Sequence, residues 1–391
     1  MAQFDPDTAT AAYLATLSPQ QHATAIAYTH GDHWLLLWGW LVTIAAAWLI
    51  VRFGLLTALR DRVRRPNLAV LACVIAYIAL DWLIELPWSI YASWGRERSY
   101  GLSSQPFTGW FGENIMSLLI SMVMFSLLLL AIYALMRRAP RRWWIWSGAV
   151  SAVAIIVLVV LSPVLIEPLF NSYTPAPAGK VRDTVVALAK DAGVPSDKIL
   201  IYNGSKQSNR YTANVSGLFG SARIAMSDTM FQQGADLAEV RGVVGHEMGH
   251  YKRGHIFWSA MILSLLAVLA FWAADRLFPA ACAWLGATGI RGIADPAGLP
   301  VLMAIVATLG LIGTPLTNTL TRLQEADADR FSLEHAHEPD GLAKALVKTV
   351  AYRASSPSRL EEIIFYDHPS VERRIHRAMV WKADHAALVG K

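Results

Sequence analysis

The segment DLAEVRGVVGHEMGHYKRGH, residues 236–255, is expected to form a helix that starts after a turn at Gly234. It contains His246 and His250, whose spacing places both imidazoles one turn apart on one helix face. Neutral imidazoles favour Zn²⁺, and a catalytic zinc takes three protein ligands and leaves one position for water. Glu247 directly follows the first histidine, so its carboxylate can accept a proton from that water. The segment therefore predicts two zinc ligands and a general base.

The third zinc ligand is expected from the carboxylates of QEADADR, residues 324–330. Glu325 and Asp329 are four residues apart and share a helix face. Glu325 is the predicted ligand. Asp329 is predicted to accept the free N–H of a ligand histidine, which would fix its tautomer. The alternative is an ordinary acidic helix turn, and the preceding histidine motif favours the zinc interpretation.

A second candidate group surrounds His368-Pro369, which precedes the basic pair Arg373 and Arg374. A histidine near zinc can stabilise the oxyanion of a tetrahedral intermediate, and an arginine can assist it. Taken alone, His368 is better explained as a histidine in a surface loop. Three further histidines lack the ligand spacing and are expected to be surface or interface residues: His255, His335 and His337.

The composition around these motifs is that of a membrane protein. Of 391 residues, 54% are hydrophobic and 16% charged, where soluble domains carry about 25% charged residues. A wholly soluble, a disordered and a collagen-like protein are thereby excluded. Six stretches are long and apolar enough to cross a bilayer: about 34–58, 67–94, 113–136, 143–168, 255–278 and 299–320. The sequence predicts an integral membrane protein with many spans.

The polar regions between the spans define the expected domain organisation. A mainly α-helical transmembrane bundle is expected to carry a small α+β zinc domain made of two separate segments. The expected divisions are a polar N-terminus at 1–33, four spans at 34–170, the motif region at 171–254, two spans at 255–320, and the rest of the zinc domain at 321–391.

The second span contains Asp81 and Glu85, which lie on one helix face. One interpretation is a helix that leaves the membrane early. The other is a helix that faces a watery interior, because carboxylates in a bilayer normally face protein or water. The two cysteines, Cys73 and Cys282, lie in apolar surroundings and exclude a disulfide scaffold.

The net charge of +5 comes largely from short arginine clusters in loops 59–66 and 137–142. Because both clusters flank apolar runs, orientation in a bilayer explains them better than nucleic-acid binding. The positive-inside rule places both loops in the cytoplasm. With six spans, the polar regions that carry the zinc motifs would then lie outside.

Together the motifs resemble the integral-membrane zinc metalloproteases of the CAAX prenyl protease type, whose bacterial relatives include the HtpX-like heat-shock proteases. The resemblance covers roughly residues 160–380. Five segments carry it: IEPLFNSYTP at 166–175, RIAMSDTM at 223–230, EVRGVVGHEMGHYKRGH at 239–255, EADAD at 325–329 and HPSVERRI at 368–375.

This resemblance implies one Zn²⁺ per chain, with the ligands His246, His250 and Glu325. It assigns the other roles to Glu247 as catalytic base, Asp329 as support of the site, and His368 and Arg374 as assistants of the transition state. Arg374 is preferred to Arg373 because the family arginine falls six residues after the histidine. Residues 205–220 would supply the edge strand for an extended peptide.

The implied fold is an integral-membrane, mainly α-helical bundle with a small α+β zinc metalloprotease domain. The implied function is that of a membrane-embedded zinc metalloendopeptidase that acts on a prenylated C-terminal peptide or on membrane or misfolded proteins. The alternatives are a transporter with a structural metal site and a non-proteolytic protein that binds membrane clients. A structural zinc normally has four protein ligands and no adjacent base, so Glu247 favours hydrolysis. The resemblance also implies a cytoplasmic catalytic domain, whereas the arginine loops and six spans place it outside, which leaves the sidedness open.

Overall fold

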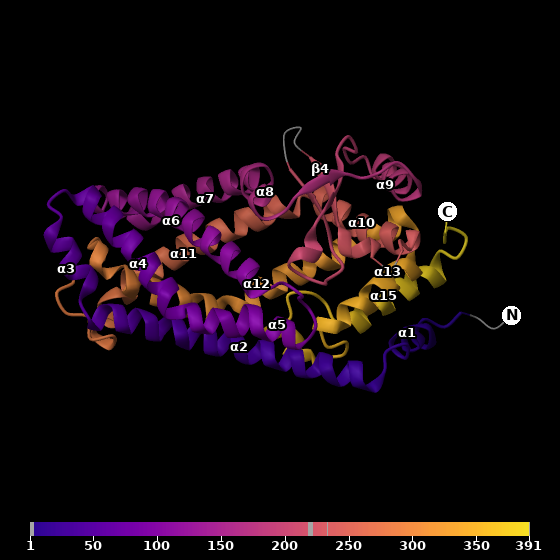
Figure 1. The fold of residues 1–391 in the computed structure, drawn as a ribbon, viewed down its shortest axis with the longest axis horizontal. Coiled ribbons are helices and arrows are strands. Elements are labelled where there is room, and N and C mark those ends of the chain that lie inside the picture. The colour runs from indigo at the N-terminus through magenta and orange to yellow at the C-terminus, as the bar shows by residue number, and fades with distance from the viewer. Residues whose placement is uncertain (1–3, 218–221, 233, 391) are drawn as a thin grey trace.

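The computed structural model describes residues 4–217, 222–232 and 234–390. These residues form an elongated, mainly helical molecule in which both chain ends lie at the end that carries the sheet (Figure 1). Within them, six helical segments are long and apolar enough to cross a membrane: Pro19–Arg52, Pro66–Ser99, Phe107–Arg138, Trp143–Phe170, His255–Trp284 and Pro296–Ala336. The predicted multi-span helix bundle is confirmed.

The bundle consists of long helices joined by short irregular turns. Its elements are α2 (Pro19–Arg52), α3 (Leu55–Arg62), α4 (Pro66–Ser89), η1 (Ile90–Gly95), α5 (Arg96–Ser99), α6 (Phe107–Arg138), α7 (Trp143–Leu161), η2 (Ser162–Ile166), α8 (Glu167–Phe170), α11 (His255–Trp284), η5 (Pro296–Gly298) and α12 (Leu299–Ala336). Large apolar side chains such as Leu127, Val153 and Leu265 remain exposed on these helices. This arrangement suits a bundle surrounded by lipid.

The first span differs from the expected run at 34–58. Helix α2 begins much earlier, at Pro19, because Ser18 and Gln21 form a capping box there. It ends before Gly54, whose positive φ of 62° breaks the helix before α3 starts. The segment before α2 also contains a helix, α1 (Pro6–Leu14), which packs against the C-terminal part of the chain.

The two carboxylates of the second span point at neighbouring protein groups. Glu85 on α4 accepts a hydrogen bond from the Thr43 hydroxyl on α2 at 2.7 Å. Asp81 accepts one from the Tyr77 hydroxyl at 3.2 Å. Both groups lie within a single continuous span, which favours the interpretation that this helix face is turned inward.

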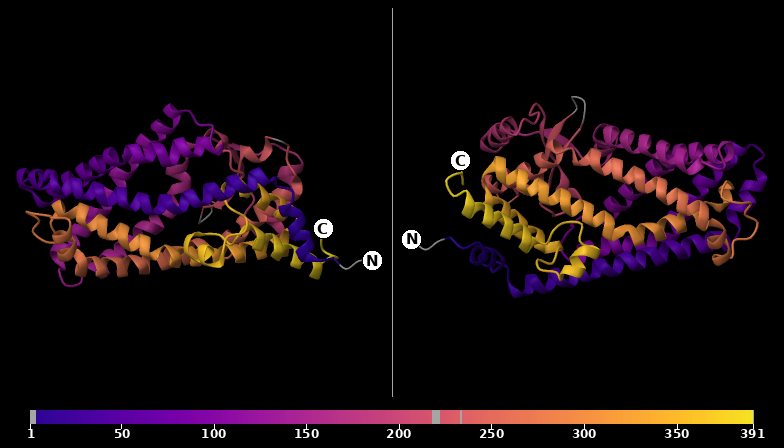
Figure 2. Two further views of the ribbon diagram at one scale, coloured as in Figure 1. Left: turned by 90° about the horizontal axis from the view of Figure 1, so that it is seen from below. Right: turned by 180° about the vertical axis from the view of Figure 1, so that it is seen from behind.

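The arginine loops and the zinc motifs occupy opposite ends of the bundle. Arg137 contacts Asn67 at 2.6 Å, which joins the C-terminal end of α6 to the start of α4. Helix α3 and the start of α4 lie at the left end of Figure 1, whereas the sheet lies toward the right. The other two views show the same separation (Figure 2). Six spans require this separation, because the arginine loops follow the first and third spans and the zinc motifs follow the fourth span and lie at the end of the sixth.

The second part of the molecule is a small sheet covered by short helices. Its elements are β1 (Tyr173–Pro175), α9 (Lys180–Asp191), β2 (Ile199–Tyr202), η3 (Gly204–Lys206), β3 (Ala213–Ser216), β4 (Arg223–Ser227), η4 (Asp228–Phe231), α10 (Leu237–Lys252), α13 (Pro339–Lys348), η6 (Thr349–Tyr352), α14 (Arg359–Phe365) and α15 (Val371–Asp384). The strand order β1-β2-β4-β3 leaves β3 at one edge. Of the expected edge segment 205–220, residues 213–216 form β3, and residues 218–220 lie outside the described residues.

Close packing of α10 against two helices positions the histidine motif. Strand β4 pairs with β3 and, together with α9, supplies the core in which Val244 and Met248 of α10 are buried. On another face of α10, a Cβ on Gly249 would lie 3.0 Å from Ala328 Cα, and one on Gly245 would lie 2.9 Å from Ser332 Oγ. These glycines let α10 approach α12 at the turn that carries Glu325.

Candidate metal centre and active site

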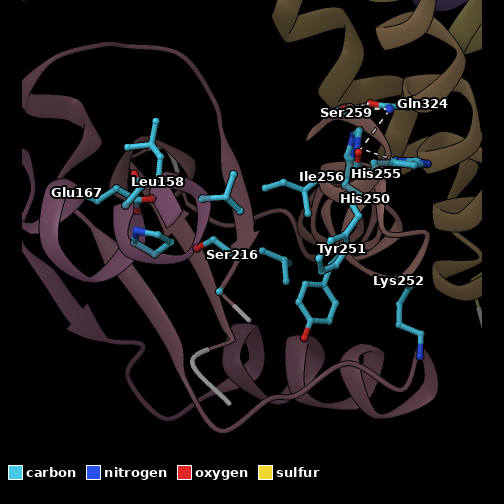
Figure 3. Close-up of a pocket in the computed structure, with 16 residues that line it drawn as sticks. Leu158, Glu167, Ser216, His250, Tyr251, Lys252, His255, Ile256, Ser259 and Gln324 are labelled. Carbon is cyan, nitrogen blue, oxygen red and sulfur yellow. Dashed lines mark hydrogen bonds between the residues drawn. The ribbon is translucent and has the colours of Figure 1, made fainter. Parts of the chain in front are cut away.

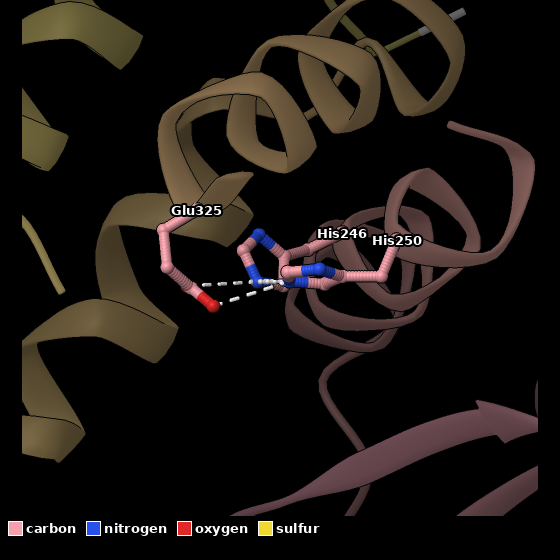
Figure 4. A group of neighbouring side chains, drawn as sticks. All are labelled: His246, His250 and Glu325. Atoms are coloured by element: carbon pink, nitrogen blue, oxygen red, sulfur yellow. Dashed lines mark hydrogen bonds and ion pairs between the residues drawn. The ribbon is translucent and has the colours of Figure 1, made fainter. Parts of the chain in front are cut away.

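Three side chains from two helices converge on one point (Figure 4). The Glu325 carboxylate on α12 lies 3.2 Å from His246 Nε2 and 3.2 Å from His250 Nε2. The two Nε2 atoms are 3.1 Å apart. Ligands bound tetrahedrally to zinc at about 2.0–2.1 Å are separated from one another by about 3.3 Å. The observed separations are therefore those of a three-ligand zinc site.

The surroundings of Glu325 support the same conclusion. This residue is only 5% exposed. Its Oε2 atom lies 3.2–3.6 Å from nitrogens of His246, His368 and Arg374, but none of the described residues donates a well-aligned hydrogen bond to it. A buried carboxylate oxygen without an aligned donor is costly unless a cation compensates it. Two imidazoles and one carboxylate are a donor set that catalytic zinc uses, so the residues present fit this ion.

A buried carboxylate and a buried guanidinium hold the His246 ring in place. His246 Nδ1 lies 2.9 Å from Asp329 Oδ1. Arg374 donates to both oxygens of Asp329, at 2.8 Å from Nε and 2.7 Å from Nη2. Asp329 and Arg374 are both buried, whereas Arg373 points to Glu362 at 3.1 Å. The structure thus places Asp329 behind His246 and brings Arg374, not Arg373, to the site.

Glu247, the predicted base, and His368 face a common cavity of about 170 Å³. Glu325 also lines this cavity, as do Tyr211, Thr212 and Ala213, which lead into β3. Burial raises the pKa of the Glu247 carboxyl above its usual value. His368 Nε2 lies 3.3 Å from Glu325 Oε2, and burial lowers the pKa of its imidazole. All seven residues expected from the sequence are therefore found around one site.

Two residues near the site were not expected from the sequence. Arg353 places Nη2 3.2 Å from His368 Nδ1, and no motif around Arg353 indicates this contact. His255 was expected to be a surface or interface residue, but it is 7% exposed. Its Nδ1 lies 2.9 Å from Nδ1 of His250. The sequence signal was its position directly after Gly254, a residue that allows the chain to turn back toward the motif.

Fold and site together are those of an integral-membrane metalloprotease, in which His246, His250 and Glu325 form a group that could hold the metal ion. Comparison with known families gives a match to the family described as "Peptidase family M48" over residues 175–382, more than half of the chain. Residues 7–172 match a second description, "CAAX prenyl protease N-terminal, five membrane helices". The chain belongs to peptidase family M48, and the class of protein predicted from the sequence is confirmed. The described part of that N-terminal region contains four candidate spans.

Individual relatives agree with this assignment. The chain is 28% identical over 282 residues to a Bacillus subtilis protein described as uncharacterized metalloprotease YhfN, covering 71% of this chain and 66% of that protein. It is 27% identical over 295 residues to the CAAX prenyl protease 1 homolog of Arabidopsis thaliana, covering 75% and 69%. The chain thus spans about two thirds of these relatives.

A solved structure shows the same fold. The crystal structure of S. mikatae Ste24p superposes with a TM-score of 0.76 at 20% sequence identity. The match covers 93% of this chain and 89% of the other. The predicted fold class, a membrane helix bundle with a small α+β zinc domain, is confirmed.

Proposed function

We propose that this protein is a membrane-embedded zinc metalloendopeptidase. The observation that carries the proposal is the convergence of Glu325 with His246 and His250, beside a cavity that Glu247 and His368 also line. A structural zinc site has no need of a base at this position. We also propose that segments 171–254 and 321–391 form one catalytic unit, because the helices α10 and α12 supply the ligands jointly.

The roles of the side chains follow from their positions. Zinc, when bound by the three ligands, supplies Lewis-acid chemistry and lowers the pKa of a water molecule. The Glu247 carboxylate accepts a proton from the attacking water and returns it to the leaving amine.

The remaining groups stabilise and orient. His368 presents Nε2 to the site and donates a hydrogen bond to the oxyanion that develops on the peptide carbonyl. Asp329 holds the His246 ring by its Nδ1–H, and Arg374 holds Asp329 by two hydrogen bonds. Arg374 also lines the cavity, where its charge favours a developing oxyanion.

The substrate is proposed to bind as an added strand. Strand β3 pairs on one side with β4 and lies at the sheet edge, and the residues that lead into it line the cavity. An extended peptide can pair with such an edge through its backbone. The substrate class is a prenylated C-terminal peptide or a membrane or misfolded protein, and the relatives named CAAX prenyl proteases favour the first.

A comparison of wild type with Glu247→Gln tests the proposal. Quenched fluorescent peptides, with and without a C-terminal isoprenyl cysteine, would be incubated with each detergent-purified protein, and zinc would be measured in both. We expect cleavage by wild type alone and about one zinc per chain in each, as the ligand set predicts. Wild-type activity in Glu247→Gln would contradict the assignment of the base. Binding without cleavage by both proteins would contradict the protease and favour a client-binding protein.

A further inference from the structure

We propose that His255 is a positioning residue for the metal ligand His250, an inference that rests on the zinc site proposed above. His255 Nδ1 lies 2.9 Å from His250 Nδ1. On the other side of the ring, His255 Nε2 lies 3.2 Å from Asp327 Oδ2. Both ring nitrogens are thus used, and the three residues form a chain of hydrogen bonds that leads away from the metal.

The direction of these hydrogen bonds follows from the metal site. His250 turns Nε2 toward Glu325 and His246, so a metal bound there takes the lone pair of that nitrogen. The ring proton of His250 is then on Nδ1, which donates to Nδ1 of His255. A neutral His255 that accepts at Nδ1 carries its proton on Nε2 and donates it to Asp327. Ligand histidines are commonly oriented by such an acceptor on the second nitrogen.

The backbone fixes His255 in this place. Gly254 has a positive φ of 65° and separates α10 from α11, so His255 becomes the first residue of α11. Gln324 on α12 donates to the His255 carbonyl at 3.5 Å and to Ser259 Oγ at 3.0 Å (Figure 3). The first turn of α11 is therefore fastened to the helix that carries both Glu325 and Asp327.

The cavity beside His255 indicates what would contact His250 in a variant without the His255 side chain. His250 and His255 both line a cavity of about 770 Å³ between α7, α11 and the end of β3 (Figure 3). This volume has room for water next to His250 Nδ1. A water molecule satisfies the N–H but does not fix the ring plane, because it has no covalent attachment. His255 therefore serves to orient the ligand as well as to satisfy its proton.

The test compares two variants of His255 with a matched histidine elsewhere. His255→Asn keeps an oxygen near the position of Nδ1 and can accept the His250 proton, whereas His255→Leu cannot. The control is His335→Leu, because His335 also contacts a carboxylate, Asp191 at 2.9 Å, but lies away from the ligands. The measurement is the zinc dissociation constant of the full-length protein in detergent, obtained by competition with a chromogenic chelator, and the Co²⁺ absorption spectrum of each variant.

We expect His255→Leu to weaken zinc binding about 10- to 100-fold, with an altered Co²⁺ spectrum. His255→Asn should recover most of the affinity, and His335→Leu should match wild type. The proposal is overturned if a folded His255→Leu binds zinc as wild type does, or if the Asn and Leu variants lose affinity equally, since size alone would then explain the loss. A wild-type protein without zinc affinity would instead contradict the proposed function.

Discussion

Three carboxylates surround the metal position, and their charges must be balanced. Glu247, Glu325 and Asp329 carry three negative charges when ionised, and Arg374 supplies one positive charge next to two of them. A divalent zinc ion would supply the other two. Buried charges are tolerated when they are compensated, so the protein part of this site is built to hold a dication.

The charge of Asp329 should matter for the metal as well as its position. We predict that Asp329→Asn lowers zinc affinity about 10- to 100-fold, because the neutral amide is a weaker acceptor for His246 and removes the carboxylate to which Arg374 donates two hydrogen bonds. The control is Asp191→Asn, which changes the exposed carboxylate that contacts His335. Chelator competition measures both variants, and an unchanged dissociation constant in Asp329→Asn would contradict the role given to this carboxylate.

Among single residues, the sequence predicts those whose roles follow from their spacing along one helix. His246, Glu247 and His250 follow from one helical turn, and Glu325 and Asp329 follow from another. The contacts of Arg353 and His255 depend on how separate elements meet, which no spacing reveals. His255 lies five residues from His250 in the sequence, yet it reaches that residue only because Gly254 redirects the chain.

Among the elements, α10 is held by unusually close helix contacts. A Cβ on Gly341, in α13, would lie 2.1 Å from the backbone oxygen of Ala238 in α10. One on Gly242 would lie 2.8 Å from the Leu342 nitrogen. The two helices therefore meet backbone to backbone, and the position of the histidine motif depends on both glycines.

Gly341→Ala should consequently separate α10 from α13. We predict a loss of about 1–3 kcal/mol in the free energy of unfolding, the usual cost of overpacking, and reduced peptide cleavage. The matched control is Gly310→Ala in α12, where an added Cβ meets no atom within 4 Å. Thermal unfolding in detergent would compare the two variants. Equal stability of Gly341→Ala and Gly310→Ala would show that the contact can relax without cost.

The sequence predicts the presence of the helices better than the residues at which they begin. Six spans are predictable because a bilayer imposes length and apolarity on each of them. The early start of α2 is less visible, because residues before 34 are polar and their helix is stabilised by contacts elsewhere. Thr29, for example, accepts a hydrogen bond from the Ala354 backbone nitrogen at 2.7 Å. Such a contact joins residues far apart in the chain and leaves no periodic pattern.

In the whole molecule, α12 belongs to both the membrane bundle and the zinc site. Its first part packs in the core of the bundle through Leu299 and Leu302, and its last turns carry Glu325 and Asp329. Metal binding at these residues would therefore connect a membrane helix to α10, which lies in the small α+β part. Removal of the metal should therefore change the stability of the molecule beyond the site itself.

Zinc removal tests this connection. Without the dication, Glu247, Glu325 and Asp329 lose the positive charge that would balance theirs alongside Arg374, and α10 and α12 lose their shared ligand. A ligand that binds only the native state stabilises it by about 2.7 kcal/mol at a free concentration 100 times its Kd. We therefore predict that a chelator lowers the apparent Tm of the wild-type protein and that added zinc restores it. The apparent Tm of Glu247→Gln should fall less on chelation, because one uncompensated charge is absent. The apparent Tm of His246→Ala should not change. An unchanged wild-type Tm after verified zinc loss would show that the two parts of the molecule hold together without the metal.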